Sequence, residues 1–237
     1  TTHVFFYVQH LLGIGHLARA SRIARAMVAE GLRVTLVTGG MPVAGFPGPG
    51  IHHIALPPVA ASSIAFAGLS DEHGVPVDQA FLDRRRDLLI AAFHAAKPDI
   101  VMTEAFPFGR KQVKFELLPL IAEIEATTPR PRLVASIRDI LQARAKPERD
   151  AETAAVVRAH YNAVLVHGDP AFAALGESFP LADQIADKVI YTGLVCPEPA
   201  PLPDERFDIV VSAGGGAVGA GMVAAAGAAA HLLPDLG

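Results

Sequence analysis

Residues 4–9, Val-Phe-Phe-Tyr-Val-Gln, form a short apolar run that leads into residues 13–16, Gly-Ile-Gly-His. Behind the glycines, apolar side chains recur at helical spacing from Leu17 to Val28, and Gly31 closes the pattern. A buried strand, a glycine turn and an amphipathic helix form the first βα unit of an open α/β sheet. Such sheets bind ligands beyond the carboxyl ends of their strands, so this glycine loop is expected at a binding crevice.

The alternation of strands and helices continues along the chain. Further strands are expected at residues 33–38, 52–56, 99–103, 133–137, 163–166 and 188–192, with helices at 81–96 and 151–159 and an irregular loop between 60 and 77. This order predicts parallel pairing with right-handed crossovers. The 237 residues are 51% apolar without Trp, which suits an aliphatic core covered on both faces. We expect a Rossmann-like domain over residues 1–196.

A proline-rich linker follows at residues 197–206, where alternating prolines block both helix and central strand. Beyond it, residues 207–212 are predicted to form a strand, Gly214-Gly215-Gly216 a loop, and the Ala-rich segment from Gly219 a helix. This pattern predicts the truncated start of a second Rossmann-like domain over 207–237, so that the chain is a fragment. Its glycine loop fits a turn that cradles phosphate, and a tight turn without a ligand is the alternative.

Composition excludes several classes of function. The formal charge of −4 argues against nucleic acid as the main partner, because phosphate backbones require clustered cations. The single cysteine, Cys196, excludes an internal disulfide framework and makes a cytoplasmic setting the default. No apolar run reaches the roughly 18 residues of a membrane span. The ten histidines show no ligand spacing, so we expect neither a metal nor another cofactor.

The first glycine loop has two interpretations. Gly13-x-Gly15-x-x-Ala18 fits the dinucleotide fingerprint, but that motif needs an acidic residue after the second strand, where Gly39-Gly40 stands. The second interpretation centres on His16. A helix N-terminus disfavours an imidazolium, which leaves a neutral ring to deprotonate a sugar hydroxyl as it attacks an anomeric carbon. A histidine that only caps its own helix is the structural alternative.

These motifs resemble a known enzyme group. The first loop with Arg19, together with residues 212–217, Ser-Ala-Gly-Gly-Gly-Ala, resembles the GT-B glycosyltransferases, especially the peptidoglycan N-acetylglucosaminyltransferase and its diacylglycerol-glycosylating relatives. More narrowly, residues 103–110 (Thr-Glu-Ala-Phe-Pro-Phe-Gly-Arg), 115–120 (Phe-Glu-Leu-Leu-Pro-Leu) and 136–140 (Ser-Ile-Arg-Asp-Ile) resemble a bacterial family of predicted glycosyltransferases.

The resemblance implies roles for individual residues. Gly13, Gly15 and His16 would face the acceptor across an interdomain cleft. Gly214, Gly215 and Gly216 would lie near the diphosphate of a nucleotide-sugar donor, UDP-linked in this group. The peptidoglycan enzyme carries more glycines before its histidine than this chain does, which leaves the acceptor class open. No metal is implied, because such enzymes stabilise the departing diphosphate with a helix N-terminus and side chains.

Other charged residues follow predicted strands. Glu104 is expected either to position His16 or bind acceptor hydroxyls, or to pair with Arg110 as a loop clamp. Arg138 is expected either to bind an anionic substrate or to form an ion pair with Asp139 or a neighbour. Residues 84–86, Arg-Arg-Arg, are predicted to be a solvated helix face, although a basic patch there would also suit a lipid-linked acceptor and a peripheral contact with the inner face of the membrane.

The predicted activity is metal-independent glycosyl transfer, with the 237 residues alone inactive because the cleft has one wall. His16 and Glu104 are the candidate catalytic residues, and Gly13, Gly15, Arg19 and Arg138 the candidate acceptor-side residues. Two alternatives stay open. A nucleotide-sugar epimerase or hydrolase of the same fold would use His16 on a sugar proton or on water. An NAD-dependent oxidoreductase would use the dinucleotide fingerprint.

Overall fold

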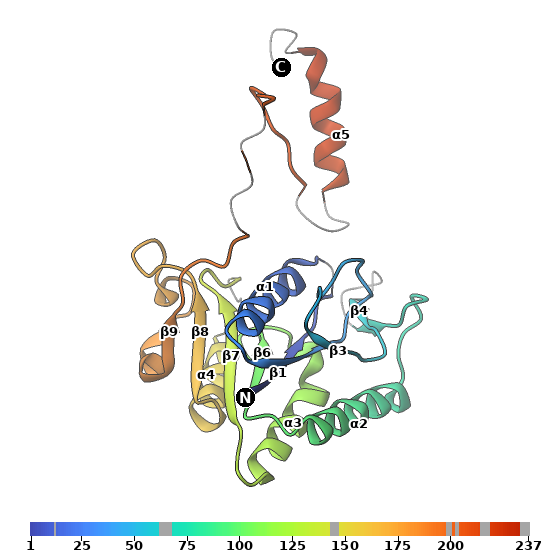
Figure 1. Cartoon of the computed structure of the whole chain (residues 1–237). Coiled ribbons are helices and arrows are strands. Elements are labelled where there is room, and N and C mark those ends of the chain that lie inside the picture. The colour runs from blue at the N-terminus through green and yellow to red at the C-terminus, as the bar shows by residue number, and fades with distance from the viewer. Residues whose placement is uncertain are drawn as a thin grey trace.

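The computed structural model describes residues 1–11, 13–61, 68–142, 147–197, 201, 204–213 and 219–232. Its main feature is a seven-stranded sheet in the order β3-β2-β1-β6-β7-β8-β9, in which every neighbouring pair is parallel (Figure 1). The expectation of a Rossmann-like α/β domain is thereby confirmed.

The strands and helices lie close to their predicted positions. The sheet contains β1 (His3–Val8), β2 (Arg33–Thr38), β3 (His52–Ala55), β6 (Ile100–Glu104), β7 (Arg132–Arg138), β8 (Ala163–His167) and β9 (Val189–Tyr191). The α-helices are α1 (Gly15–Ala29), α2 (Gln79–Ala96), α3 (Lys114–Ala126), α4 (Glu148–His160) and α5 (Ala220–Ala229). A two-stranded antiparallel sheet, β4 (Ala60–Ala61) with β5 (Leu69–Ser70), lies in the segment expected to be irregular. Short 3₁₀ turns cover Lys111–Val113, Leu175–Glu177, Ala182–Lys188 and Ala230–Leu232.

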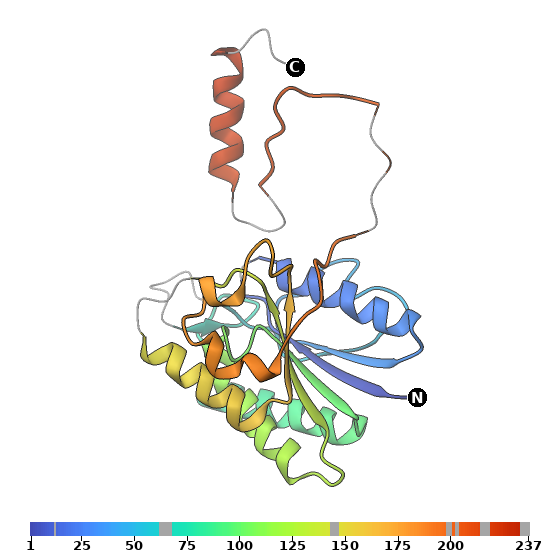
Figure 2. The same ribbon diagram turned by 90° about the vertical axis from the view of Figure 1, so that its left-hand side faces the viewer.

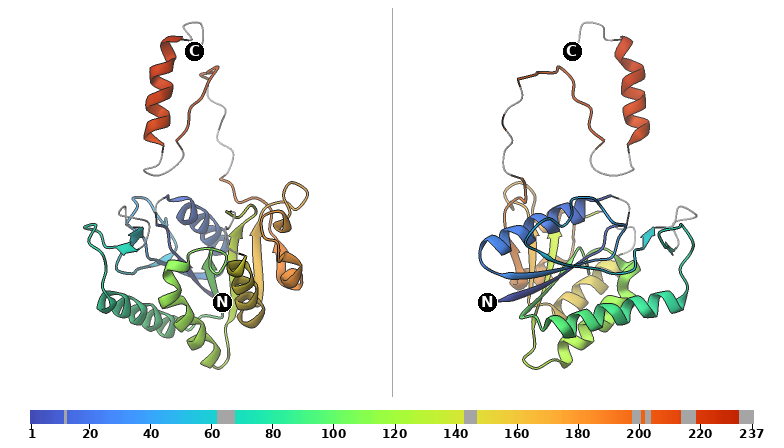
Figure 3. Two further views of the ribbon diagram at one scale, coloured as in Figure 1. Left: turned by 180° about the vertical axis from the view of Figure 1, so that it is seen from behind. Right: turned by 45° about the vertical axis from the view of Figure 1, so that its right-hand side comes forward.

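Helices cover both faces of the sheet. Alternate side chains of β1 point to opposite faces, as the pleat requires. Val4, Phe6 and Val8 pack with α1 on one face, whereas Phe5 and Tyr7 belong to the larger core under α2, α3 and α4. Figure 3 shows this arrangement, with α1 above the sheet and α2, α3 and α4 below it. The continuous apolar runs of the sequence therefore reflect strands that are buried on both sides.

Helix α3 is absent from the expected elements. Pro119 lies inside it, and a proline in a helix interior removes one hydrogen bond and costs about 3 kcal/mol. The helix nevertheless buries Leu117, Leu120, Ile121 and Ile124 against the core. Each such burial contributes about 1.5–3 kcal/mol, which together outweighs the cost of the proline.

The expected strand at residues 207–212 is wrong. These residues are exposed and have no strand structure, because no strand in the described part of the chain pairs with them. The helix expected from Gly219 is present as α5, which has no buried residue and stands apart from the sheet in Figure 2. Gly214, Gly215 and Gly216 lie outside the described residues, and the division into two domains stays a prediction.

The expectation of a solvated face at residues 84–86 is wrong for Arg85, which is fully buried. Its Nε donates to Oε2 of Glu116 at 2.8 Å, and Nη1 donates to the carbonyl oxygen of Gly39 at 2.7 Å. A Cβ at Gly39 would lie only 2.0 Å from Nη2 of Arg85, so glycine leaves the space that the guanidinium occupies. The Tyr7 hydroxyl also donates to Glu116. This charged cluster ties β1, α2 and α3 together beneath the sheet.

Candidate active site

The candidate site lies at the point where the order of the sheet reverses. β1 is flanked by β2 on one side and β6 on the other, and α1 and α3 cover opposite faces. A crevice forms at the carboxyl ends of the strands at such a switch point. The Gly13–His16 loop follows β1, and Glu104 is the last residue of β6. Residues 88 positions apart in sequence therefore meet at one place.

His16 and Glu104 form a hydrogen-bonded pair. Nδ1 of His16 lies 2.9 Å from Oε1 of Glu104. The Glu104 side chain is fully buried, whereas the His16 side chain is 27% exposed. Since a carboxylate oxygen only accepts, Nδ1 carries a proton, and in the neutral form of the ring Nε2 is the acceptor. Nε2 has no hydrogen-bond partner among the described residues. The pair thus presents a basic nitrogen at the mouth of the crevice.

Arg19 lies one turn further along α1 and contacts the same carboxylate oxygen through Nη2. Burial acts to raise the pKa of Glu104, but the hydrogen bond from His16 and the charge of Arg19 hold that pKa below its ordinary value. Glu104 is therefore a carboxylate at neutral pH. The alternative pairing of Glu104 with Arg110 is wrong, because Nε of Arg110 donates to the carbonyl oxygen of Gln9 at 2.8 Å.

Two further strands complete the surroundings of Glu104. The Ser136 hydroxyl, near the end of β7, donates to Oε2 of Glu104 at 2.6 Å. Nε2 of His167, the last residue of β8, lies 2.9 Å from the same hydroxyl, and Nδ1 lies 2.7 Å from the hydroxyl of Thr192. Because Ser136 donates to Glu104, His167 donates to Ser136 and accepts from Thr192. The chain of hydrogen bonds fixes the carboxylate that orients His16.

Sequence reasoning missed Ser136 and His167 as parts of the site. Ser136 stands out in the sequence only as part of a family motif, and the sequence of residues 167–170, His-Gly-Asp-Pro, predicts a strand end followed by a helix N-terminus with Asp169 as its N-cap. Their position could have indicated a role, since both lie near the carboxyl ends of β7 and β8, the two strands that follow β6 in the sheet. Recognising this position requires the strand order, which the sequence pattern does not provide.

The buried imidazole of His167 predicts a loss of stability in acid. Burial lowers its pKa from 6.5 to about 4. Between these values the unfolded chain binds the extra proton, so the free energy of unfolding should fall by up to about 3 kcal/mol as the pH drops from 6.5 to 4. Urea denaturation of wild type and His167→Gln across this range measures the effect. The variant should lose less stability than wild type, and parallel curves would contradict the assignment.

A pocket of about 730 Å³ opens beside His16. It is lined by His16 and Arg19 from α1, by residues 105–112 after β6, by Arg138 at the end of β7, and by side chains of α3 and α4. Ala105 and Arg110 in its wall have positive φ angles of 65° and 58°. Such backbone strain costs about 1–3 kcal/mol at each residue and persists only where surrounding contacts enforce it. A hydrogen bond of 2.8 Å from the Ala105 amide to the Ser136 carbonyl is one such contact.

The other predicted acceptor-side residues also lie near this pocket. Gly15 begins α1, and a Cβ added there would meet nothing within 4 Å, so packing does not require glycine. Gly13 lies between β1 and α1 and is partly buried. Arg138 is exposed in the pocket and forms no ion pair with Asp139 or any other described residue. The Asp139 carboxylate instead accepts from the amide of Ile140 at 2.8 Å.

Within the part of the chain that the structure describes, no three His, Cys, Asp or Glu side chains converge as a metal site would require. None of its helices has the length and apolar character needed to cross a membrane.

The fold has counterparts among solved structures, although neither a protein-family model nor a curated protein matches the sequence significantly. A glycosyltransferase from Rickettsia africae ESF-5 matches with a TM-score of 0.52 and 12% identity, over 81% of this chain and 42% of that chain. Apo UGT2 from Phytolacca americana matches with a TM-score of 0.51 and 12% identity, over 84% of this chain and 53% of that chain.

The chain has the fold of part of a GT-B glycosyltransferase. It spans about half the length of the two matched proteins. At 12% identity the GT-B likeness concerns the fold alone.

Proposed function

We propose that the protein is a metal-independent glycosyltransferase that moves a sugar from a nucleotide-sugar donor, UDP-linked, to an acceptor hydroxyl. The observation that carries this proposal is the hydrogen bond between His16 and the buried Glu104 at the switch point of a GT-B fold. A buried carboxylate that orients an exposed imidazole is the arrangement of a general base.

In the proposed reaction, the acceptor hydroxyl lies at Nε2 of His16 and loses its proton to the ring as its oxygen attacks the anomeric carbon. The bond between that carbon and the diphosphate oxygen breaks, and the nucleoside diphosphate leaves with both bonding electrons. Glu104 then stabilises the imidazolium. Gly214, Gly215 and Gly216 are proposed to receive the diphosphate, and Gly13 and Gly15 to leave room for the acceptor.

The sequence motifs support a relationship to particular glycosyltransferases. In this proposal the protein is related to the peptidoglycan N-acetylglucosaminyltransferase, to its diacylglycerol-glycosylating relatives and to the bacterial family of predicted glycosyltransferases. It would act in the cytoplasm, with a peripheral contact at the inner face of the membrane if its acceptor is lipid-linked. The 237 residues alone would be inactive, because they cover only about half of a two-domain cleft.

Ligand-dependent stability of the full-length protein tests the donor class. A ligand at 100 times its dissociation constant stabilises a protein by about 2.7 kcal/mol, which raises the melting temperature by several degrees. UDP-sugars should produce this increase and NAD should not, since no acidic residue follows β2 to hold a ribose. Stabilisation by NAD alone would overturn the proposal. Release of UDP that depends on an added acceptor would distinguish transfer from hydrolysis and epimerisation.

A further inference from the structure

The wall of the pocket beside His16 is strongly basic. Six of its lining side chains are cationic: Arg19, Arg110, Lys111, Lys114, Arg138 and Arg149. Glu152 is the one acidic side chain that lines it among the described residues. The whole chain has a formal charge of −4, so this pocket concentrates positive charge against the overall balance.

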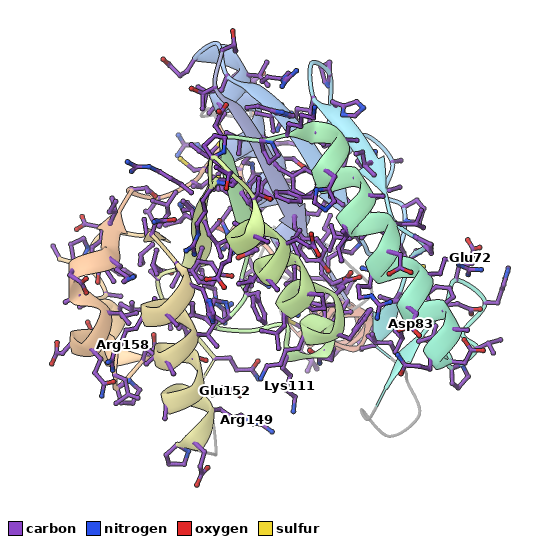
Figure 4. All side chains as sticks on the ribbon, turned by 90° about the horizontal axis from the view of Figure 1, so that it is seen from below. Glu72, Asp83, Lys111, Arg149, Glu152 and Arg158 are labelled. Carbon is purple, nitrogen blue, oxygen red and sulfur yellow. The ribbon has the colours of Figure 1, made fainter. Side chains whose placement is uncertain are left out.

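Some of these cations are already paired. Nζ of Lys114 contacts Glu152, and Arg19 contacts Glu104 behind the wall. Figure 4 shows Lys111, Arg149 and Glu152 on the same side of the molecule, where α3 and α4 adjoin. Acidic partners therefore neutralise one part of the pocket and leave the other part positive.

The remaining excess comes from Arg110 and Lys111, in the segment between β6 and α3, and from Arg138 at the end of β7. Arg138 and Lys111 are exposed, and neither has an ion-pair partner in the part of the chain that the structure describes. Arg110 uses Nε for the Gln9 carbonyl, and no described carboxylate pairs with its guanidinium. Cations that converge on one hollow repel each other unless an anion joins them.

The geometry of the cations favours phosphate. Arginine presents a planar fork of N–H donors that fits a phosphate or a carboxylate with two parallel hydrogen bonds. Three cationic groups without acidic partners carry about three positive charges, which one carboxylate with its single negative charge balances poorly. A phosphate carries nearly two negative charges at neutral pH and balances them better. Their pocket also contains His16, so a phosphate bound there belongs to the molecule whose hydroxyl reaches the base.

We propose that the acceptor carries a phosphate group, which binds against Arg110, Lys111 and Arg138 while its hydroxyl lies at His16. This inference rests on the proposed function, because only that function makes the pocket an acceptor site. The phosphate could belong to a soluble sugar phosphate or to a lipid headgroup, and the pocket chemistry is the same for both.

Calorimetric titration of the full-length protein with glucose 6-phosphate at low ionic strength tests the site. The double variant Lys111→Gln and Arg138→Gln should bind this probe at least about tenfold more weakly than wild type, since each charge-assisted hydrogen bond contributes about that factor or more. Arg132→Gln is the matched control. It removes one exposed arginine from the opposite end of strand β7 and should change the affinity less than about twofold.

Two further arms identify the source of the phosphate. Glucose without the phosphate should not compete for the site. Vesicles of phosphatidylcholine that contain phosphatidic acid should compete with glucose 6-phosphate if the natural group is a lipid headgroup, and pure phosphatidylcholine vesicles should not. Competition by the anionic vesicles assigns a lipid acceptor, and its absence assigns a soluble one.

The inference and the proposed function can fail separately. If wild type does not bind the probe, or if the double variant binds it as tightly as wild type, the phosphate site is wrong even where sugar transfer is intact. Phosphate binding that depends on Arg138 and Lys111 in a protein without transferase activity would overturn the proposed function instead.

Discussion

Replacing His16 by alanine should lower kcat for glycosyl transfer in the full-length protein by about 10²–10⁴ while the fold survives. The imidazole is the one group at the mouth of the crevice, within the described residues, that combines a free acceptor nitrogen with a buried carboxylate behind it. Without it the acceptor hydroxyl must lose its proton to water. Initial rates of UDP release measure the turnover, and far-ultraviolet circular dichroism measures the fold.

His160 provides the control for this variant. Its Nδ1 also lies 2.9 Å from a glutamate oxygen, in this case Oε1 of Glu125. Both side chains are partly exposed, His160 at the end of α4 and Glu125 near the end of α3, and neither lines the pocket. His160→Ala should leave kcat within about twofold of wild type, because a surface ion pair contributes at most about 1 kcal/mol to stability. Equal rates for His16→Ala and His160→Ala would remove His16 from the mechanism.

Replacing Arg85 by methionine should lower the free energy of unfolding by about 3–5 kcal/mol. Both Arg85 and Glu116 are fully buried, and removing one partner leaves the other charge in the protein interior without compensation. The change would also remove the hydrogen bonds that Arg85 donates to the carbonyl oxygens of Gly39 and Pro57. Guanidinium chloride denaturation, followed by far-ultraviolet circular dichroism, gives the difference in unfolding free energy.

The neighbouring residue Arg86 separates burial from charge. It pairs with Asp83 and Asp87 on the surface of the same helix, where its side chain is 33% exposed. Arg86→Met should change the free energy of unfolding by less than about 1 kcal/mol. A loss at Arg85 no larger than the loss at Arg86 would show that the buried cluster does not contribute to stability.

The fold could be predicted largely from the sequence, because buried parallel strands appear as apolar runs and the intervening helices show a different period. The errors have identifiable causes. Helix α3 was not predicted because Pro119 disfavours a helix. The sequence pattern does not show the burial of apolar side chains that outweighs this cost. Arg85 stands between two arginines with acidic neighbours, so its sequence surroundings resemble an exposed face. At residues 207–212 the strand pattern is present, but no described strand pairs with it.

The candidate site was only partly predictable. His16 stands out because a glycine loop and a helix N-terminus follow the first strand. Its pairing with Glu104 depends on β1 and β6 being neighbours, and Ser136 and His167 join only through the order of β7 and β8. The periodicity of the sequence predicts where each strand lies along the chain, but not which strands are neighbours in the sheet. The contacts that orient His16 depend on which strands are neighbours.

The central claim, that Glu104 acts by orienting His16 as a base, is tested most directly by a double-mutant cycle on kcat. The four proteins are wild type, His16→Ala, Glu104→Gln and the variant with both changes, each checked for folding. We predict that Glu104→Gln is strongly impaired and that the double variant is no slower than His16→Ala within about twofold, because the two residues act as one unit. If the two losses multiply in the double variant, Glu104 acts independently of His16 and the account is wrong.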